Sequence, residues 1–261
     1  MAGGWFHTLL LRSDGQAAAF GRDDQGSFKY EVLAPAAGSS YVEAACGLYH
    51  SVLLCDNGVA VACGSNSIGQ CDVPELPAGV KYIQAAASEH HTALLRSDGG
   101  SEVFGNNFWG QCSVPGIDKN LSYTGVAVGL RHTVLLRSDG QVVAVGQKDG
   151  GCCEIPELPW GLRYDAVAAG GCHTVLLRSD GEALAFGRNN CGQTDVPPLP
   201  NGMRYMVASA GGTHTVLLRS DGQAVTCGAN ACGQCDIPPL PEGTVYVHAS
   251  AGYRHTLLLR S

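Results

Sequence analysis

The sequence predicts an all-β protein made of one repeated unit, and two series of residues carry this prediction. Histidines recur with a first spacing of 43 residues and then five spacings of 41, at His7, His50, His91, His132, His173, His214 and His255. Tyrosines recur every 41 residues, at Tyr41, Tyr82, Tyr123, Tyr164, Tyr205 and Tyr246. Because two independent markers keep one register, a unit of about 41 residues fills the 261-residue chain about six times.

Each unit contains three clear strand signals and one weaker signal. In the unit that begins at Tyr164, we expect strands over residues 164–170, 173–178 and 182–187, and a fourth strand near 194–196. The second segment, HTVLLR, is apolar on both faces, which is typical of a strand covered on both sides. No segment shows a sustained 3.6-residue apolar period, so we expect essentially no helix.

The segments between these strands have the chemistry of turns. Arg-Ser-Asp-Gly at residues 178–181 separates two apolar runs, and Asp-Gly favours a tight hairpin because glycine accepts positive φ without steric cost. Pro-Pro-Leu-Pro at residues 197–200 cannot donate to a strand ladder, so it ends the sheet and leads to the next unit.

A four-stranded sheet of 41 residues has two apolar faces that it cannot bury alone, and radial stacking of such sheets buries both. We therefore predict a single domain, residues 1–261, forming a β-propeller of about six four-stranded blades. The ring would be closed by pairing of the N- and C-terminal strands, with residues 246–252 as the inner strand beside the first units and residues 255–260 surplus. The alternative is an incomplete seven-blade ring.

The repeated motif resembles the regulator of chromosome condensation repeat. It appears as GLRHTVLLRSDG from Gly129, as GNNFWGQ from Gly105 and as GANACGQ from Gly228. The resemblance implies a propeller, usually of seven blades. The short repeat is similar to those in the propeller modules of giant HECT-type ubiquitin ligases. The family also contains an exchange factor for the small GTPase Ran and a plant ultraviolet-B photoreceptor. Its motif residues build the scaffold, so the resemblance implies the fold and no particular activity.

Composition argues against several classes of function. The net charge of −7 and the absence of a basic stripe argue against nucleic-acid binding. No apolar run is long enough to span a bilayer, and residues 1–15 do not resemble an export signal. We therefore expect a monomer in the cytoplasm or nucleus, with twelve reduced cysteines.

Three recurring residue types invite a chemical role, and each has a simpler structural interpretation. Equivalent histidines in a ring lie too far apart to share one zinc ion, so we expect them to bond backbone at the corner before the second strand. Cys232 and Cys235 have metal-ligand spacing, but in other units the two equivalent positions hold only one cysteine, as at Cys191 and Thr194 or at Trp109 and Cys112. Arginines before the hairpin turns, such as Arg137, precede an acid by two residues and predict paired turn charges. We expect no catalytic residue, no metal and no cofactor, and we expect that the protein is not an enzyme.

The candidate binding residues occupy positions where the repeats diverge. Antiparallel geometry places the loop before each histidine and the loop after each third strand at one end of the sheets. At this end the repeats vary toward aromatic residues and arginine, which is typical of binding hot spots. The predicted partner-binding residues are Trp5, Phe6, Leu48, Tyr49, Phe108, Trp109, Arg131, Tyr253 and Arg254.

Two functions follow from this surface. The first is a protein–protein interaction scaffold, one version of which is a ubiquitin-ligase substrate adaptor or a fragment of such a ligase. The alternative is a guanine-nucleotide exchange factor with a small GTPase as its partner. The sequence shows no blade insertion that could form the wedge that exchange requires.

Overall fold

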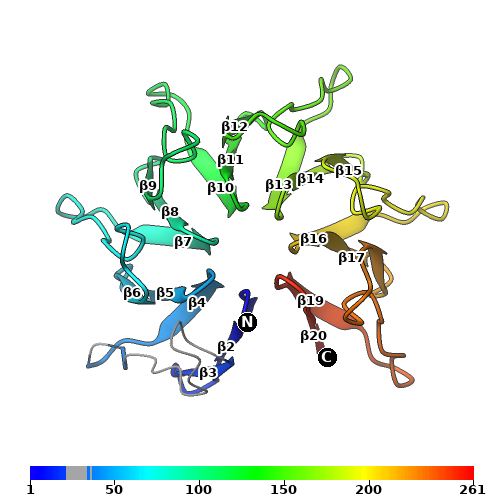
Figure 1. The fold of residues 1–261 in the computed structure, drawn as a ribbon, viewed down its shortest axis with the longest axis horizontal. Coiled ribbons are helices and arrows are strands. Elements are labelled where there is room, and N and C mark those ends of the chain that lie inside the picture. Colours follow the sequence, from blue (N-terminus) through cyan, green and yellow to red (C-terminus); the bar gives the residue numbers. More distant parts are fainter. Residues whose placement is uncertain (22–33, 36) are drawn as a thin grey trace.

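The structure, a computed structural model, describes residues 1–21, 34–35 and 37–261. These residues form β-strands, turns and irregular segments and contain no helix. The strands build six three-stranded sheets and one two-stranded sheet, arranged around a central axis (Figure 1). The all-β propeller architecture predicted from the repeat is confirmed, whereas the described part of the chain has seven sheets where the sequence favoured about six.

The strands fall into three sets according to their place in a sheet. The innermost strands are β1 (Ala2–Gly3), β4 (Tyr41–Cys46), β7 (Tyr82–Ala87), β10 (Tyr123–Val128), β13 (Tyr164–Ala169), β16 (Tyr205–Ala210) and β19 (Tyr246–Ala251). The middle strands are β2 (His7–Leu11), β5 (His50–Cys55), β8 (His91–Arg96), β11 (His132–Arg137), β14 (His173–Arg178), β17 (His214–Arg219) and β20 (Thr256–Arg260). The outer strands are β3 (Ala17–Gly21), β6 (Ala60–Gly64), β9 (Ser101–Gly105), β12 (Val142–Gly146), β15 (Ala183–Gly187) and β18 (Ala224–Gly228).

Two details of the predicted blade are wrong. The fourth strand expected near residues 194–196 is a tight turn in which the Val196 amide donates to the Thr194 carbonyl at 2.9 Å. The predicted ring closure also differs, because β19 pairs with β20 in its own sheet and the short strand β1 takes the inner place beside β2. Residues 256–260 are therefore a regular middle strand and are not surplus.

The first and last sheets share no ladder among the described residues, yet they meet through hydrogen bonds. The Gly3 amide donates to Ser250 Oγ at 3.0 Å, and the Tyr253 amide donates to the Gly4 carbonyl at 3.0 Å. β1 accordingly contacts β19, and the N-terminus of the chain lies beside β19 in Figure 1.

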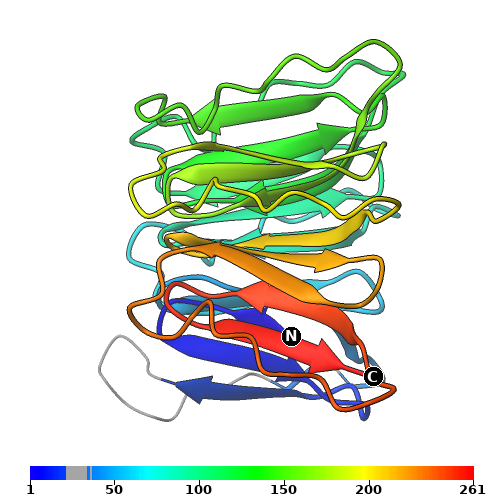
Figure 2. The same cartoon turned by 90° about the vertical axis from the view of Figure 1, so that its right-hand side faces the viewer.

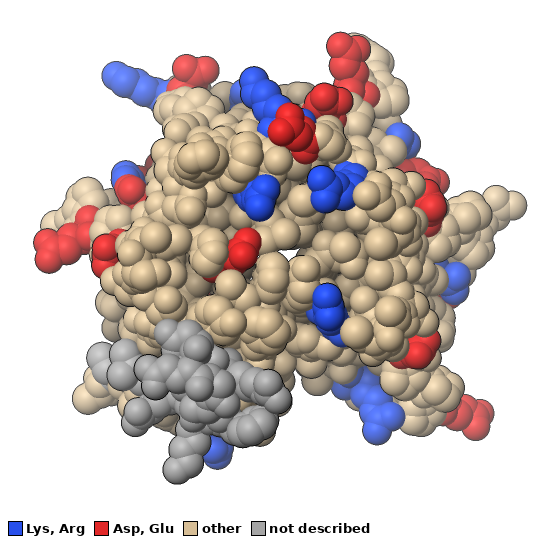
Figure 3. All heavy atoms as spheres, viewed as in Figure 1, with Lys and Arg blue, Asp and Glu red and all other residues tan. Residues whose placement is uncertain are grey.

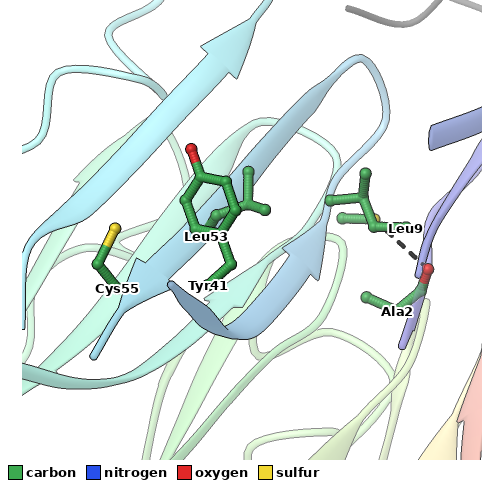
Figure 4. Packing of buried hydrophobic residues seen from close by; sticks show 6 residues of the cluster. Ala2, Leu9, Tyr41, Leu53 and Cys55 are labelled. Carbon is green, nitrogen blue, oxygen red and sulfur yellow. Dashed lines mark hydrogen bonds between the residues drawn. The ribbon is translucent and has the colours of Figure 1, made fainter. Parts of the chain in front are cut away.

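The core consists of apolar side chains buried between neighbouring sheets. Leu9 and Leu53 are fully buried and lie with Ala2, Tyr41 and Cys55 in the cluster between the first two sheets (Figure 4). Equivalent clusters recur around the ring, because every middle strand carries apolar residues on both faces. Each such side chain contributes about 1.5–3 kcal/mol by leaving water.

The recurring tyrosine joins this core to the proline segment. Its ring is buried, and in five units its hydroxyl donates to the backbone carbonyl of the first proline in the segment eight residues earlier, as from Tyr164 to Pro156 at 2.9 Å. A buried hydroxyl without a partner would be costly, so the repeat keeps tyrosine together with the proline segment that supplies its acceptor.

The recurring histidine links one sheet to the next. Each imidazole Nε2 lies 2.8–3.2 Å from a Ser or Thr hydroxyl of the following middle strand. The last of these bonds joins His255 to Thr8, and thus the last sheet to the first. The expected backbone bond of the imidazole is therefore wrong, but its structural role at the sheet junctions is clear.

The direction of these hydrogen bonds fixes the state of the imidazole. The Thr92 hydroxyl donates its proton to the Gln70 carbonyl at 2.8 Å, so it can only accept from His50 Nε2–H. The ring is then the neutral tautomer protonated at Nε2. Burial accounts for most of this preference, since it lowers the pKa of His50 to about 3, with smaller contributions from His7 and His90.

Candidate functional site

The candidate site is built on the loops that follow the inner strands at one end of the sheets. Figure 2 shows the connections gathered at two opposite ends of the stacked strands. We call the loops between inner and middle strands the collar; they comprise residues 4–6, 47–49, 88–90, 129–131, 170–172, 211–213 and 252–254. Several collar residues line a narrow opening on the central axis (Figure 3).

Backbone hydrogen bonds join neighbouring collar loops. The Trp5 amide donates to the Gly47 carbonyl at 3.2 Å, and the Leu48 amide donates to the Ser88 carbonyl at 3.1 Å. Similar bonds connect the loops of the fourth to the seventh sheets, and the bond from Tyr253 to Gly4 connects the seventh loop to the first. Because these bonds join neighbouring loops at six of the seven junctions, side chains on the collar are positioned before any partner arrives.

The structure brings four of the predicted aromatic residues together. The Trp5 and Tyr253 rings are stacked, with centroids 3.6 Å apart and planes inclined by 8°. Phe6 meets Trp5 edge-on at 6.5 Å and stacks with Tyr49 at 5.5 Å. These residues, which we call the aromatic group, come from three loops that are far apart in sequence and adjacent across the junction of the chain ends.

A glycine makes the central stack possible. A side chain at Gly212 would place its Cβ 2.4 Å from the Tyr253 ring and 2.7 Å from the Tyr253 carbonyl oxygen. The Gly212 amide also donates to that carbonyl at 3.2 Å. The bare backbone of the sixth loop therefore lies directly against the Tyr253 ring, and a bulky residue at position 212 would displace it.

A second group forms on the third and fourth sheets. Phe108 and Trp109 meet edge-on with centroids 5.1 Å apart, and the Arg131 guanidinium lies 5.2 Å from the centre of the Trp109 ring. Phe108 is 82 % exposed. In the aromatic group, the Arg254 guanidinium lies 5.5 Å from the centre of the Tyr253 ring, as the Arg131 guanidinium does over Trp109. The predicted binding residues with aromatic rings therefore form two groups in the described part of the chain, and no ring contact joins the groups there.

Leu48 differs from the other predicted contact residues. Its side chain is only 8 % exposed, because the loop of the second sheet lies against the Ser88 loop. Leu48 thus supports the collar and offers little surface to a partner, whereas its neighbour Tyr49 remains half-buried and takes part in the aromatic group.

Known proteins share both the repeat and the architecture. Residues 164–193 and 208–234 match the family model of the Regulator of chromosome condensation (RCC1) repeat. The structure of Prp20p from Saccharomyces cerevisiae superposes with a TM-score of 0.82 at 18 % identity, over 98 % of this chain and 81 % of that one. Human WBSCR16 superposes with a TM-score of 0.82 at 17 % identity, over 100 % of this chain and 86 % of that one. The chain is an RCC1-like repeat β-propeller.

The fold also occurs in a protein of another kind. The ectodomain of the Arabidopsis thaliana receptor kinase ACR4 matches with a TM-score of 0.71 at 18 % identity, over 97 % of this chain and 86 % of that one. At these identities the likeness establishes the fold alone. Comparison with the sequences of characterised proteins finds no significant match.

The centre of this RCC1-like propeller is a polar cavity of about 390 Å³, lined by the inner strands. Glu43 lies there and accepts from the Ala85 amide of the next sheet at 3.3 Å. Burial raises the pKa of Glu43 to about 7, so much of this carboxyl is protonated at neutral pH. Gln84 accepts from the Val126 amide at 3.1 Å in the same way. These side chains therefore satisfy the free edges of inner strands.

The described residues contain no group of three or more histidine, cysteine, aspartate or glutamate side chains arranged to hold a metal ion. The same part of the propeller contains no helix that could cross a membrane. Its cysteines are all free thiols in the structure, and burial raises the pKa of Cys46 to about 12.

We expect thiol titration of the denatured protein to find all twelve cysteines reduced, and elemental analysis to find no stoichiometric zinc. The physical reason is that the cysteines occupy separate repeat positions as small apolar residues. A thiol count well below twelve, or about one zinc per chain, would contradict this expectation.

One exposed apolar feature was missed by the sequence reasoning. The residue after the recurring tyrosine occupies a bulge in the inner strand, and in four units it is apolar and exposed: Val42, Ile83, Met206 and Val247. Met206 and Val247 lie near the hairpin turn of residues 219–222. The signal that could have revealed them is the repeated apolar residue directly after tyrosine.

Proposed function

We propose that this propeller is a protein-binding scaffold and that the aromatic group is its principal contact surface. The observation that carries the proposal is the stack of Trp5 on Tyr253 beside Phe6 and Tyr49. Phe6 is 47 % exposed, so the group presents apolar rings to solvent on a collar held by backbone hydrogen bonds. Large aromatic residues that are positioned in advance are typical of binding hot spots.

A ubiquitin-ligase substrate adaptor, or a module of such a ligase, is the specific version of this proposal. Its support is the sequence resemblance of the repeat, and a non-enzymatic chain in the cytoplasm or nucleus would suit that role. The partner would be recruited by the collar while another part of the ligase assembly performs the chemistry.

The alternative is a guanine-nucleotide exchange factor. Prp20p, which shares the fold, was characterised together with its binding properties to Gsp1p and histones. A small GTPase is therefore the partner that this alternative assigns to the present propeller. In this case we expect the propeller to bind the nucleotide-free GTPase more tightly than the GTP- or GDP-loaded form, since an exchange factor stabilises the empty state.

Replacement of Trp5 and Tyr253 by alanine is expected to weaken partner binding by about 2–4 kcal/mol, the scale of hot-spot residues. The measurement is affinity purification with quantitative mass spectrometry, followed by binding of the recovered partner to wild type and variant. The melting temperature should change little, because both rings lie at the surface of the collar.

The matched control is Trp160→Ala, which removes a fully exposed tryptophan on a proline segment. Partners that are lost with the double variant and retained with Trp160→Ala support the proposed surface. A large loss of stability with binding intact would show instead that Trp5 and Tyr253 serve the fold. The second arm of the experiment measures binding of small GTPases prepared in the GTP-loaded, the GDP-loaded and the nucleotide-free state.

A further inference from the structure

Two groups of arginines, at opposite ends of the sheets, have different partners. At the hairpin turns between middle and outer strands, each described arginine forms an ion pair with the aspartate two residues later, as Arg12 does with Asp14 at 2.7 Å. The same pairing holds at the other turns that carry arginine: Arg96–Asp98, Arg137–Asp139, Arg178–Asp180 and Arg219–Asp221. These charges are neutralised within the protein.

Arg131, Arg188 and Arg254 at the collar end behave differently. All three are exposed, and within the described part of the chain none has a carboxylate within ion-pair distance. Arg188 directly follows β15, and its amide donates to the Cys172 carbonyl of the collar. Although the net charge of the chain is −7, Figure 3 shows basic side chains around the central opening and acidic side chains mostly at the periphery.

Two of these cations belong to the same pair of neighbouring loops. The Arg188 amide donates to the Cys172 carbonyl at 2.8 Å, and the amide of Leu130, the residue before Arg131, donates to the Gly170 and Gly171 carbonyls of the same loop at 3.3 Å. Arg131 is held in place by the Trp109 ring at 5.2 Å and by Gln147 Oε1 at 3.5 Å from its Nη1. Glu89 is the acidic residue on the collar, and it faces His90 Nε2 at 3.4 Å.

A guanidinium stacked on an aromatic ring keeps its N–H edge free for a carboxylate, which it can bind through two parallel hydrogen bonds. Three cations on a protein of net negative charge are too few to hold a polyphosphate chain, because nucleic-acid binding depends on several phosphate contacts. We propose that the collar binds an acidic segment of a partner protein, with its carboxylates on Arg131 and Arg188. This inference rests on the proposed protein-binding function and specifies the chemistry of the partner.

The test uses fluorescence anisotropy with three probes carrying the same label: a flexible glutamate-rich peptide, its lysine-rich counterpart and a single-stranded oligonucleotide. We expect saturable binding of the glutamate-rich peptide alone, weakened by added salt. The double variant Arg131→Gln/Arg188→Gln should weaken it by about tenfold or more, the scale of one lost charge-assisted hydrogen bond.

The matched control is Arg12→Gln/Arg163→Gln, which removes the same charge from two paired arginines whose side chains are 62 % and 68 % exposed. Its affinity should stay within about twofold of wild type, on the scale of screened surface charges. Arg131→Lys/Arg188→Lys should fall between wild type and the glutamine variant, since lysine keeps the charge but not the planar fork.

Three results would each overturn the inference: no saturable binding of the glutamate-rich peptide at millimolar concentration, an equal loss in the control variant, or tighter binding of the oligonucleotide. The proposed function would survive any of them if a natural partner still depended on Trp5 and Tyr253. If those aromatic residues also proved dispensable for every partner, the proposed function itself would fail.

Discussion

Lowering the pH from 7 to 5 is expected to reduce the free energy of unfolding by several kcal/mol, because the histidines between the sheets are buried and neutral. Burial lowers the pKa of His50, His91 and His173 to about 3 and of His7 and His214 to about 4. In the unfolded chain these rings bind protons near their ordinary pKa of about 6.5.

The direction of this stability change follows from the protons that the unfolded chain binds. Below pH 6.5 the unfolded state binds protons that the folded state does not, so stability falls with pH until the folded rings also titrate, near pH 4 to 3. Each such histidine contributes a loss of about 2 kcal/mol at pH 5, and five give on the order of 10 kcal/mol as an upper figure. Glu43 acts in the opposite direction, since its pKa is raised to about 7, but it is a single group.

The measurement is urea unfolding at pH 7, 6 and 5. A loss comparable to the 5–15 kcal/mol typical of a whole domain predicts an acid transition near pH 5. His50→Gln should reduce the slope of stability against pH, because it removes one of the buried neutral rings. Stability that is flat between pH 7 and pH 5 would show that these rings are not held neutral in the fold.

Deletion of residues 255–261 is expected to abolish cooperative folding. The deletion removes β20, which is the one ladder partner of β19 among the residues that the structure describes, and leaves the edge of β19 exposed. It also removes Thr256, which accepts from His214, and His255, which meets Thr8. The expected loss exceeds about 4 kcal/mol, because a whole strand and its buried contacts disappear together.

A six-blade ring in which these residues are surplus predicts a loss of at most about 1–2 kcal/mol, the ordinary scale of a single change. Thermal unfolding of the truncated chain separates the two expectations. As a milder control, Thr8→Val at the junction of the chain ends removes one histidine–hydroxyl bond and should cost about 1 kcal/mol. Thr133→Val within the ring also removes the hydroxyl's bond to the Gln111 carbonyl and should cost about 2 kcal/mol. A negligible effect of Thr8→Val alone would indicate that the ends are not joined like the other sheets.

The repeat determines much of this fold, because each marker has a physical partner within the blade. The tyrosine is tied to a proline carbonyl and the histidine to a hydroxyl of the next sheet, so their spacing reports the unit directly. The number of sheets was harder to predict. β1 is only Ala2–Gly3, which has neither the tyrosine marker nor an alternating pattern, so the first sheet could not be counted from the sequence.

The candidate site was predictable at surface positions that the blade does not need for its own folding, because these positions differ from one repeat to the next. Trp5, Phe6, Tyr49 and Tyr253 stood out because the fifth and sixth units hold only glycine, cysteine and threonine at the equivalent positions, and the ring geometry then brings the four aromatic residues together. The burial of Leu48 could not be predicted, since it depends on the neighbouring loop at Ser88. The separation of the unpaired arginines from the paired ones likewise required the structure.

Hydrogen–deuterium exchange of the propeller with and without its purified partner tests the central proposal most directly. The account predicts that protection on binding is concentrated in the collar segments 4–7, 47–50 and 252–255, which carry the aromatic group. The hairpin turns at residues 12–15, 55–58 and 96–99 should exchange at the same rate in both samples. Protection of those turns with an unchanged collar would place the binding surface on the opposite face and contradict the account.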